Sequence, residues 1–189
     1  MHTKNILTLF LLLAQLIAQK PIWPTDAGNS YSSNFGEYRD DHFHMGLDVR
    51  TNGTIGHKAF ATENGYISRI VTNYSGYGKA LYQKTNSGKT IVYAHLNKFS
   101  PIIERVLKLQ QSKNKKYSVS INFSPNEFRL NQGDVIGLTG ETGYAFGPNL
   151  HFEVRDESDV ALDPLSNGYL TTDKVTPIIH NIALIPLSK

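Results

Sequence analysis

Short runs in which β-branched or aromatic residues alternate with polar ones occupy most of the chain, and each run ends near a glycine or an asparagine. This pattern is typical of half-buried β-strands joined by tight turns. The sequence therefore predicts a mainly β protein with short, mostly antiparallel connections. The clearest candidate strands are residues 65–72, 79–84, 90–95, 135–139 and 150–155.

One stretch departs from the alternation. Ser100 and Pro101 open a run with apolar residues at helical spacing, which ends in the lysine-rich residues 112–116. A serine cap and a proline at the first helical position favour a helix start. Alternation then resumes over residues 117–123. We therefore expect one inserted helix followed by a strand, as an excursion from the main sheet.

Length and composition narrow the classes of site that the chain can build. The 189 residues suffice for about one domain, and none of them is cysteine. Disulfides, thiolate ligands and cysteine nucleophiles are therefore excluded, and a metal must be bound by His, Asp or Glu. The net charge of +3 comes from scattered basic residues rather than a dense stripe. We therefore expect no nucleic acid partner.

The N-terminus carries a targeting pattern. Lys4 precedes a leucine-rich apolar run over residues 6–17, and the small residue Ala18 follows. This order is typical of a secretory signal and the run is short for a bilayer span, although a buried helix is an alternative. We expect residues 1–19 to be a signal peptide. The mature chain is then exported to the periplasm or cell envelope, without a transmembrane span.

The remaining segment boundaries follow from changes in amino-acid composition along the chain. Residues 20–34, with several prolines and glycines, are predicted to be an irregular leading segment, and residues 35–166 form the main domain. The tail, residues 167–189, contains one possible strand over residues 175–186. A lone strand is not stable by itself, so it either joins the main sheet or begins a further domain.

Histidines and one aspartate are the candidates for chemistry. In the predicted strand, His151 and Glu153 share the face opposite Leu150 and Phe152, so His151 should point away from the apolar core. By the same reasoning, His95 should lie opposite the apolar face of its own strand.

A cysteine-free catalytic zinc site needs three imidazole or carboxylate ligands and leaves the fourth position for water. His44, Asp48 and His151 would supply that set, and a neighbouring histidine can transfer protons. Spacing alone is weak support, because a His-x-x-x-Asp pair is common and an isolated histidine is more often a surface or core residue.

Several motifs in a fixed order resemble the lysostaphin-type, or LytM-type, zinc endopeptidases. They are the His-x-x-x-Asp of His44 to Asp48, a Tyr-x-His-Leu strand end containing His95, a Gly-Asp-x-Ile-Gly turn at residues 133–137, and a late strand with His151. The likeness covers roughly residues 35–165. Several linked motifs in order are far more specific than any one alone.

The resemblance implies a mainly β antiparallel fold, described as a duplicated hybrid motif, with zinc on the floor of an open groove. By matching position, His44, Asp48 and His151 are the implied Zn²⁺ ligands, and His95 is an implied catalytic histidine. The family's substrates are usually peptidoglycan peptides. The resemblance also implies that the inserted helix and strand help to wall the groove.

The chain departs from the family at Asn149, where the family has its second catalytic histidine. An asparagine donates or accepts a hydrogen bond but cannot transfer a proton at neutral pH. Losing one proton-transfer group typically lowers the rate by about 10²–10⁴. Asn149 can still orient water or stabilise the oxyanion, so we regard it as a polar auxiliary.

Three further residues are possible auxiliaries. His42 is either a substitute for the missing histidine or a rim residue, and Tyr38 is a candidate to assist the oxyanion. Glu153 either orients a ligand histidine or forms a surface ion pair with a base such as Arg155.

Two functions remain open. The first is an exported zinc metalloendopeptidase that hydrolyses peptidoglycan peptides. The second is a catalytically weakened module that binds cell wall or regulates a partner hydrolase. Asn149 favours the second and the complete ligand set favours the first. An unrelated carbohydrate-binding β-sandwich would leave the histidine and aspartate placement unexplained.

Overall fold

The computed structural model describes residues 19–172. Nearly all of the expected signal peptide and the strand expected over residues 175–186 lie outside the described residues. Within residues 19–172, no helix has the length and apolar character needed to cross a membrane.

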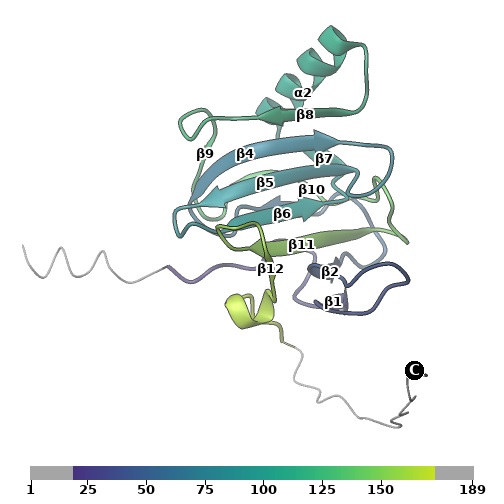
Figure 1. Cartoon of the computed structure of the whole chain (residues 1–189), viewed down its shortest axis with the longest axis vertical. Helices are drawn as coiled ribbons and strands as arrows, with labels where there is room; N and C mark the ends of the chain where they lie inside the picture. The colour runs from purple at the N-terminus through teal and green to yellow at the C-terminus, as the bar shows by residue number, and fades with distance from the viewer. Residues whose placement is uncertain (1–18, 173–189) are drawn as a thin grey trace, which may run out of the picture.

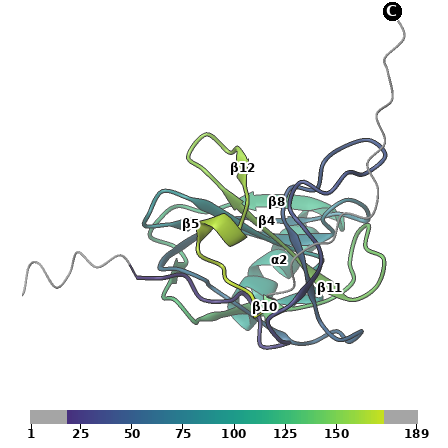
Figure 2. The ribbon, with the colours of Figure 1, turned by 90° about the horizontal axis from the view of Figure 1, so that it is seen from below.

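A large antiparallel sheet forms the body of the protein (Figure 1). Its main path runs β1-β2-β11-β6-β5-β4-β8, while β12 pairs with β11 and β9 pairs with β4. The strands are β1 (Tyr31–Ser33), β2 (Leu47–Arg50), β4 (Gly65–Thr72), β5 (Lys79–Thr85), β6 (Thr90–Ala94), β8 (Val119–Asn122), β9 (Arg129–Leu130), β11 (Asn149–Arg155) and β12 (Ala161–Leu162). The hairpin that carries β12 projects from the body, as Figure 2 shows.

A smaller antiparallel sheet has the order β3-β10-β7, with β3 (Lys58–Phe60), β7 (Lys98–Phe99) and β10 (Val135–Leu138). The described residues also contain one α-helix, α2 (Pro101–Asn114), and a 3-10 turn, η1 (Leu165–Asn167). One hydrophobic cluster joins both sheets to α2. Its members include Leu47, Ile70, Leu81, Tyr93, Ile103, Leu107, Ile136, Leu150 and Phe152.

The predicted fold class is confirmed: the described chain is mainly β and antiparallel, with one inserted helix. The five candidate strands are present as β4, β5, β6, β10 and β11, with ends that differ by at most one residue from the prediction. Lys115 ends α2 in the left-handed conformation, inside the lysine-rich segment expected to terminate it.

Two expectations about the insertion are wrong. β8 pairs with β4, so it extends the main sheet as an edge strand rather than leaving it. The helix and β8 also lie at the opposite edge of the sheet from β1 and β2 (Figure 1), and they do not line the groove described below.

The predicted irregular segment over residues 20–34 contains a strand, β1, which pairs with β2.

The pairing of β2 with β11 positions the site. Its register sets Asp48 opposite His151, with Leu47 opposite Phe152 on the neighbouring pair. Because Leu47 and Phe152 are fully buried in the core, Asp48 and His151 share the other face of the sheet. Apolar burial on one face thus fixes which polar side chains meet on the other.

Gly46, just before β2, allows this close pairing. A Cβ atom added there would lie 2.3 Å from the backbone oxygen of Phe152, which no side chain tolerates. A glycine between His44 and Asp48 is therefore a packing requirement of the β2–β11 contact.

Candidate metal centre

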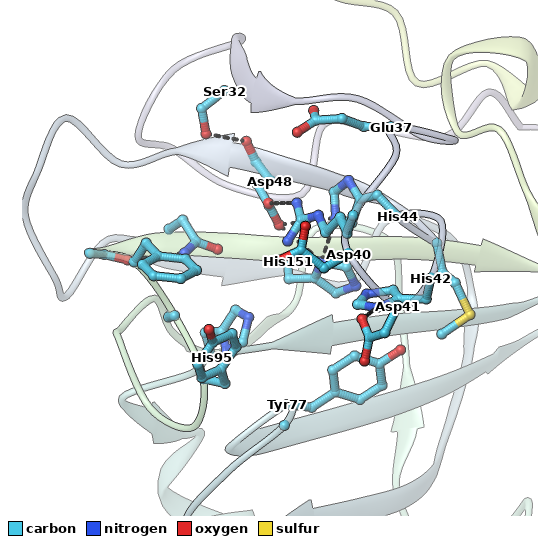
Figure 3. Close-up of a pocket in the computed structure, with 18 of the residues that line it drawn as sticks. Ser32, Glu37, Asp40, Asp41, His42, His44, Asp48, Tyr77, His95 and His151 are labelled. Atoms are coloured by element: carbon cyan, nitrogen blue, oxygen red, sulfur yellow. Dashed lines mark hydrogen bonds and ion pairs between the residues drawn. The ribbon is translucent and has the colours of Figure 1, made fainter. Parts of the chain in front are cut away.

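The structure brings together the three residues expected to bind a metal (Figure 3). Nε2 of His44 lies 3.2 Å from Oδ1 of Asp48 and 3.0 Å from Nδ1 of His151, and that Nδ1 lies 2.9 Å from the same Oδ1. Zinc bonds of about 2.0–2.2 Å in a tetrahedron place ligand atoms roughly 3.3 Å apart. The three atoms thus have nearly the mutual spacing of three corners of a zinc site.

The second nitrogen of each histidine ring is held by an acceptor. Nδ1 of His44 donates to the backbone oxygen of Asn34 at 2.8 Å, and Nε2 of His151 donates to Oε1 of Glu153 at 2.8 Å. Metal-binding histidines almost always use their other nitrogen in this way, which fixes the tautomer and the ring orientation. The donor set therefore fits a zinc ion on chemistry as well as spacing.

Glu153 is more deeply buried than either interpretation from the sequence implied. It is fully buried, accepts from Nε of Arg155 at 2.7 Å, and is also hydrogen-bonded by the hydroxyl of Tyr77. The ion pair with Arg155 considered from the sequence is present, but it is buried rather than at the surface. The expected contact with a ligand histidine is present.

The charges of the three central residues are strongly coupled. Burial disfavours the ionised carboxyl of Asp48, but hydrogen bonds from His151 and His44 outweigh it and hold the pKa far below its ordinary range. Burial also opposes protonation of His151, yet its hydrogen bonds to Asp48 and Glu153 raise its pKa to about 9. Without a metal, His151 is thus a cation between two carboxylates.

His95 faces the same site, for a reason that the sequence pattern missed. Its neighbour Ala94 lies opposite His151 and shares that face, so strict alternation would send His95 into the core. The backbone of His95 is left-handed, with φ of 59°, and β6 ends just before it. This turn of the backbone, rather than strand alternation, brings its ring centroid to 5.8 Å from that of His151.

Hydrogen bonding fixes the tautomer of His95. Its Nδ1 lies 2.8 Å from the backbone oxygen of Thr142, which can only accept, so Nδ1 carries the proton and Nε2 is free to act as a base. Burial lowers the pKa of His95 below its ordinary value, although the bond to Thr142 opposes the shift. The ring is therefore neutral at pH 7.

Asn149 begins β11 on the same face as His151. Its amide nitrogen donates to the backbone oxygen of Gly147 at 3.0 Å. Its Oδ1 is buried and has no hydrogen-bond partner within residues 19–172. A free acceptor therefore lies beside the candidate metal ligands.

The other two auxiliaries lie farther out. His42 is about half exposed, pairs with Asp41 and lines the rim of the groove, which agrees with its interpretation as a rim residue. Tyr38 is highly exposed, forms an edge contact with Phe43, and is not among the residues that line the groove. The structure gives no support for its role at the oxyanion.

Two residues at the site were not found from the sequence. Arg39 donates to Oδ2 of Asp48 at 2.9 Å, leaving Oδ1 for the metal cluster. The ring of Tyr77 stacks on His151, with centroids 5.3 Å apart. Neither residue lies in a motif with its partner, and only the folded chain brings them to the site.

These residues lie in a groove of about 630 Å³. One wall comes from the loop before β2 and includes Asp40, His42 and Met45, and the other comes from Tyr144 and Phe146 in the loop before β11. Both aromatic side chains are largely exposed and contact each other edge to face. The candidate metal ligands thus lie at the base of an open channel rather than in a closed cavity.

No protein-family model matches the sequence, and no curated protein matches it either. Solved structures do match it. A zinc-containing peptidase from Vibrio cholerae is 24% identical with a TM-score of 0.55, over 77% of this chain and 39% of that one. The catalytic domain of the antimicrobial peptidase lysostaphin from Staphylococcus simulans is 23% identical with a TM-score of 0.52, over 73% of this chain and 90% of that domain. LytU is 26% identical with a TM-score of 0.52, over 74% of this chain and 83% of the LytU chain.

Fold and neighbours together define the class: the chain contains a LytM-type domain. The family resemblance inferred from the motifs is therefore confirmed. The chain spans well under half the length of the Vibrio protein.

Proposed function

We propose that the chain is an exported zinc metalloendopeptidase that hydrolyses peptide bonds in peptidoglycan. The observation that carries the proposal is the convergence of His44, Asp48 and His151 on one point, with ligand atoms 2.9–3.2 Å apart. The peptidase names of two structural neighbours support the reaction class, and the signal-like N-terminus supports export. The peptidoglycan substrate rests on the family resemblance.

The three ligands leave one side of the cluster open to the groove. A zinc ion bound there supplies Lewis acidity and lowers the pKa of its water to about 7. Asp48 contributes one oxygen, because Arg39 holds the other. Glu153 and the backbone of Asn34 keep the two imidazoles turned toward the open position.

His95 is the proton-transfer group in this proposal. Its free Nε2 takes a proton from the attacking water and returns it to the leaving amine. Thr142 holds the ring in the tautomer that this transfer requires. Asn149 keeps an unpaired acceptor, its buried Oδ1, beside the ligands and takes no proton.

Metal analysis of the mature chain, paired with digestion of purified muropeptides, tests the proposal. We expect about one zinc per chain and cleavage products that disappear in an Asp48→Ala variant. Asp48 is the matched choice because its carboxylate contacts both ligand histidines. A chain that binds no zinc, or binds zinc and cleaves nothing, contradicts the enzyme assignment.

The second candidate is a module that binds cell wall or regulates a partner hydrolase. Asn149 favours it, since the groove then lacks one of the two proton-transfer histidines of the family. Sedimentation with intact sacculi separates the two functions: a non-catalytic module binds sacculi without releasing peptides, with zinc present or removed.

A further inference from the structure

The groove continues past the candidate metal ligands into a smaller pocket. This pocket has a volume of about 230 Å³ and shares Ser32 and Pro148 with the groove. Ser32 lies beside Asp48 at the upper rim in Figure 3, where its hydroxyl donates to the backbone oxygen of Asp48. A peptide that lies over the metal cluster therefore has room to extend along β2 into this pocket.

Arg50 is the charged residue of the small pocket. It is two residues beyond Asp48 on β2, so both side chains project from the same face of the sheet. It also lies directly opposite Asn149 in the pairing of β2 with β11. Two residues of a strand span roughly 6.6 Å, about the length of two residues of an extended peptide substrate.

The guanidinium of Arg50 is oriented but has donors to spare. Its Nε donates to the backbone oxygen of Tyr31 at 3.0 Å, and it forms no ion pair with any residue in the described range 19–172. The remaining lining of the pocket is neutral, formed by Ser32, Thr51, Asn52, Gly53 and Pro148. No acidic side chain among the described residues therefore competes for the charge inside the pocket.

Thr51 adds a second polar feature. It is almost fully buried, lines the same pocket, and its hydroxyl oxygen has no hydrogen-bond partner among residues 19–172. Because that oxygen is itself buried, Thr51 forms the wall of the pocket, and Arg50 is the group with donors available to an anionic ligand group. Arginine binds carboxylates through two parallel hydrogen bonds, which adds geometric selectivity.

We propose that this pocket, defined by Arg50, Thr51 and Ser32, binds a carboxylate of the peptide substrate, one or two residues from the bond that is cut. The inference rests on the proposed peptide substrate and adds a preference to it: chains that end in a free carboxylate close to the scissile bond.

The test compares two short peptides of the wall-stem type that end in D-alanine and differ only in a free C-terminal carboxylate or a C-terminal amide. Dissociation constants are measured by calorimetry with a zinc-loaded His95→Gln chain, so that cleavage does not interfere. We expect the carboxylate form to bind about ten- to a hundredfold more tightly, as for hydrogen bonds to charged groups. Added salt should reduce this ratio.

Variants identify the residue responsible. Arg50→Gln should bring the two dissociation constants together by weakening only the carboxylate form, and Arg50→Lys should retain part of the preference. Arg105→Gln is the matched control, because Arg105 is an exposed arginine on α2, at the far edge of the sheet. It should leave the preference unchanged.

Equal binding of the two peptides overturns the inference, as does an Arg50→Gln variant that weakens both forms to the same degree. Absence of measurable binding for both peptides also overturns it. These outcomes are separate from failure of the proposed function, because the binding measurement needs no turnover. An enzyme that cuts muropeptides without preferring the carboxylate form would support the proposed function and contradict the proposed carboxylate pocket.

Discussion

Glu153 accepts a hydrogen bond from Nε2 of His151 at 2.8 Å, and this contact directs the other nitrogen of the ring toward Asp48. The glutamate is fully buried, yet its charge is balanced by Arg155 and by the protonated His151. The orientation of a candidate metal ligand therefore depends on a carboxylate that contacts no metal.

Removing this carboxylate should weaken both zinc binding and the fold. We expect Glu153→Ala to lower zinc affinity by about 10–100-fold, because His151 loses the acceptor that orients it. The change also removes the buried partner of Arg155, whose remaining ion pair is with Asp159. We therefore expect a loss of unfolding free energy below the about 3–5 kcal/mol typical of a fully unpaired buried charge. Chelator competition and urea unfolding measure the two effects. Glu153→Gln, which keeps an acceptor oxygen, is the control and should lose less zinc affinity. An unchanged zinc dissociation constant for Glu153→Ala would contradict the orienting role.

Zinc uptake should release about one proton near pH 7, because the metal requires a neutral imidazole and the pKa of His151 is raised to about 9 in the metal-free chain. Apparent affinity should therefore rise with pH up to about 9 and then level off. The stability of the fold should depend on pH in the opposite direction, because the pKa of His151 in the folded chain exceeds its unfolded value of about 6.5. The stabilisation that His151 contributes is therefore complete below pH 6.5 and is lost as the pH rises through about 9. Calorimetry of zinc binding in buffers of different ionisation enthalpy counts the protons. Zero proton release at pH 7 would show that His151 is already neutral.

His95 should govern turnover without governing metal content. We expect His95→Gln to reduce kcat by about 10²–10⁴ with zinc stoichiometry unchanged, because the ring transfers protons and is not among the clustered ligands. In the unaltered chain, kcat/KM should fall on the acid side only below pH 6.5. The reason is that burial lowers the pKa of His95, so the base stays neutral to lower pH. A pH–rate profile with zinc assays at each point provides the measurement. Equal rates for the unaltered chain and the His95→Gln variant would show that His95 does not transfer the proton.

Asn149→His should raise the rate, because it restores a second proton-transfer group on the face that carries His151. The gain can reach about 10²–10⁴ if proton transfer limits turnover. Asn149→Ala serves as the comparison: it removes the free acceptor Oδ1 and should lower the rate below that of the unaltered chain. The test measures muropeptide cleavage rates for the three chains, normalised to bound zinc. Three indistinguishable rates would mean that residue 149 has no role in catalysis.

Gly46→Ala should destabilise the chain by about 1–3 kcal/mol, because the added Cβ would lie 2.3 Å from the backbone oxygen of Phe152 and must push β2 away from β11. Zinc affinity should fall with it, since Asp48 and His151 lie on the separated strands. Met45→Ala, next in the chain and partly exposed, should change the unfolding free energy by no more than about 0.5 kcal/mol. Equal thermal unfolding of the two variants would disprove the packing role of Gly46.

The sequence predicted the long strands and the helix well, because their patterns are local. β11 alternates apolar and polar residues, and β4 is rich in β-branched residues, so both can be recognised without knowing their neighbours. Short strands such as β1 and β7 were missed, since two or three residues carry no measurable period. They form because the partner strand supplies the hydrogen bonds.

At the site, the sequence predicted which residues meet but not how they are supported. His44, Asp48 and His151 were identified through spacing and family motifs, and the β2–β11 register brings them together. The left-handed turn at His95 and the complete burial of Glu153 depend on contacts from other segments, so no local pattern encodes them.

Two of the clustered ligands, Asp48 and His151, lie on strands that are hydrogen-bonded neighbours in the sheet, yet they are 103 positions apart in the sequence. His44 lies in the loop just before β2. A chain interrupted between β2 and β11 would contain His44 and Asp48 but would lack the third donor, His151. Metal binding by all three residues would therefore require that synthesis has passed residue 151 and that the last long strand has inserted between β2 and β6. A metal-binding assay would therefore distinguish chains that include β11 from chains truncated between β2 and β11.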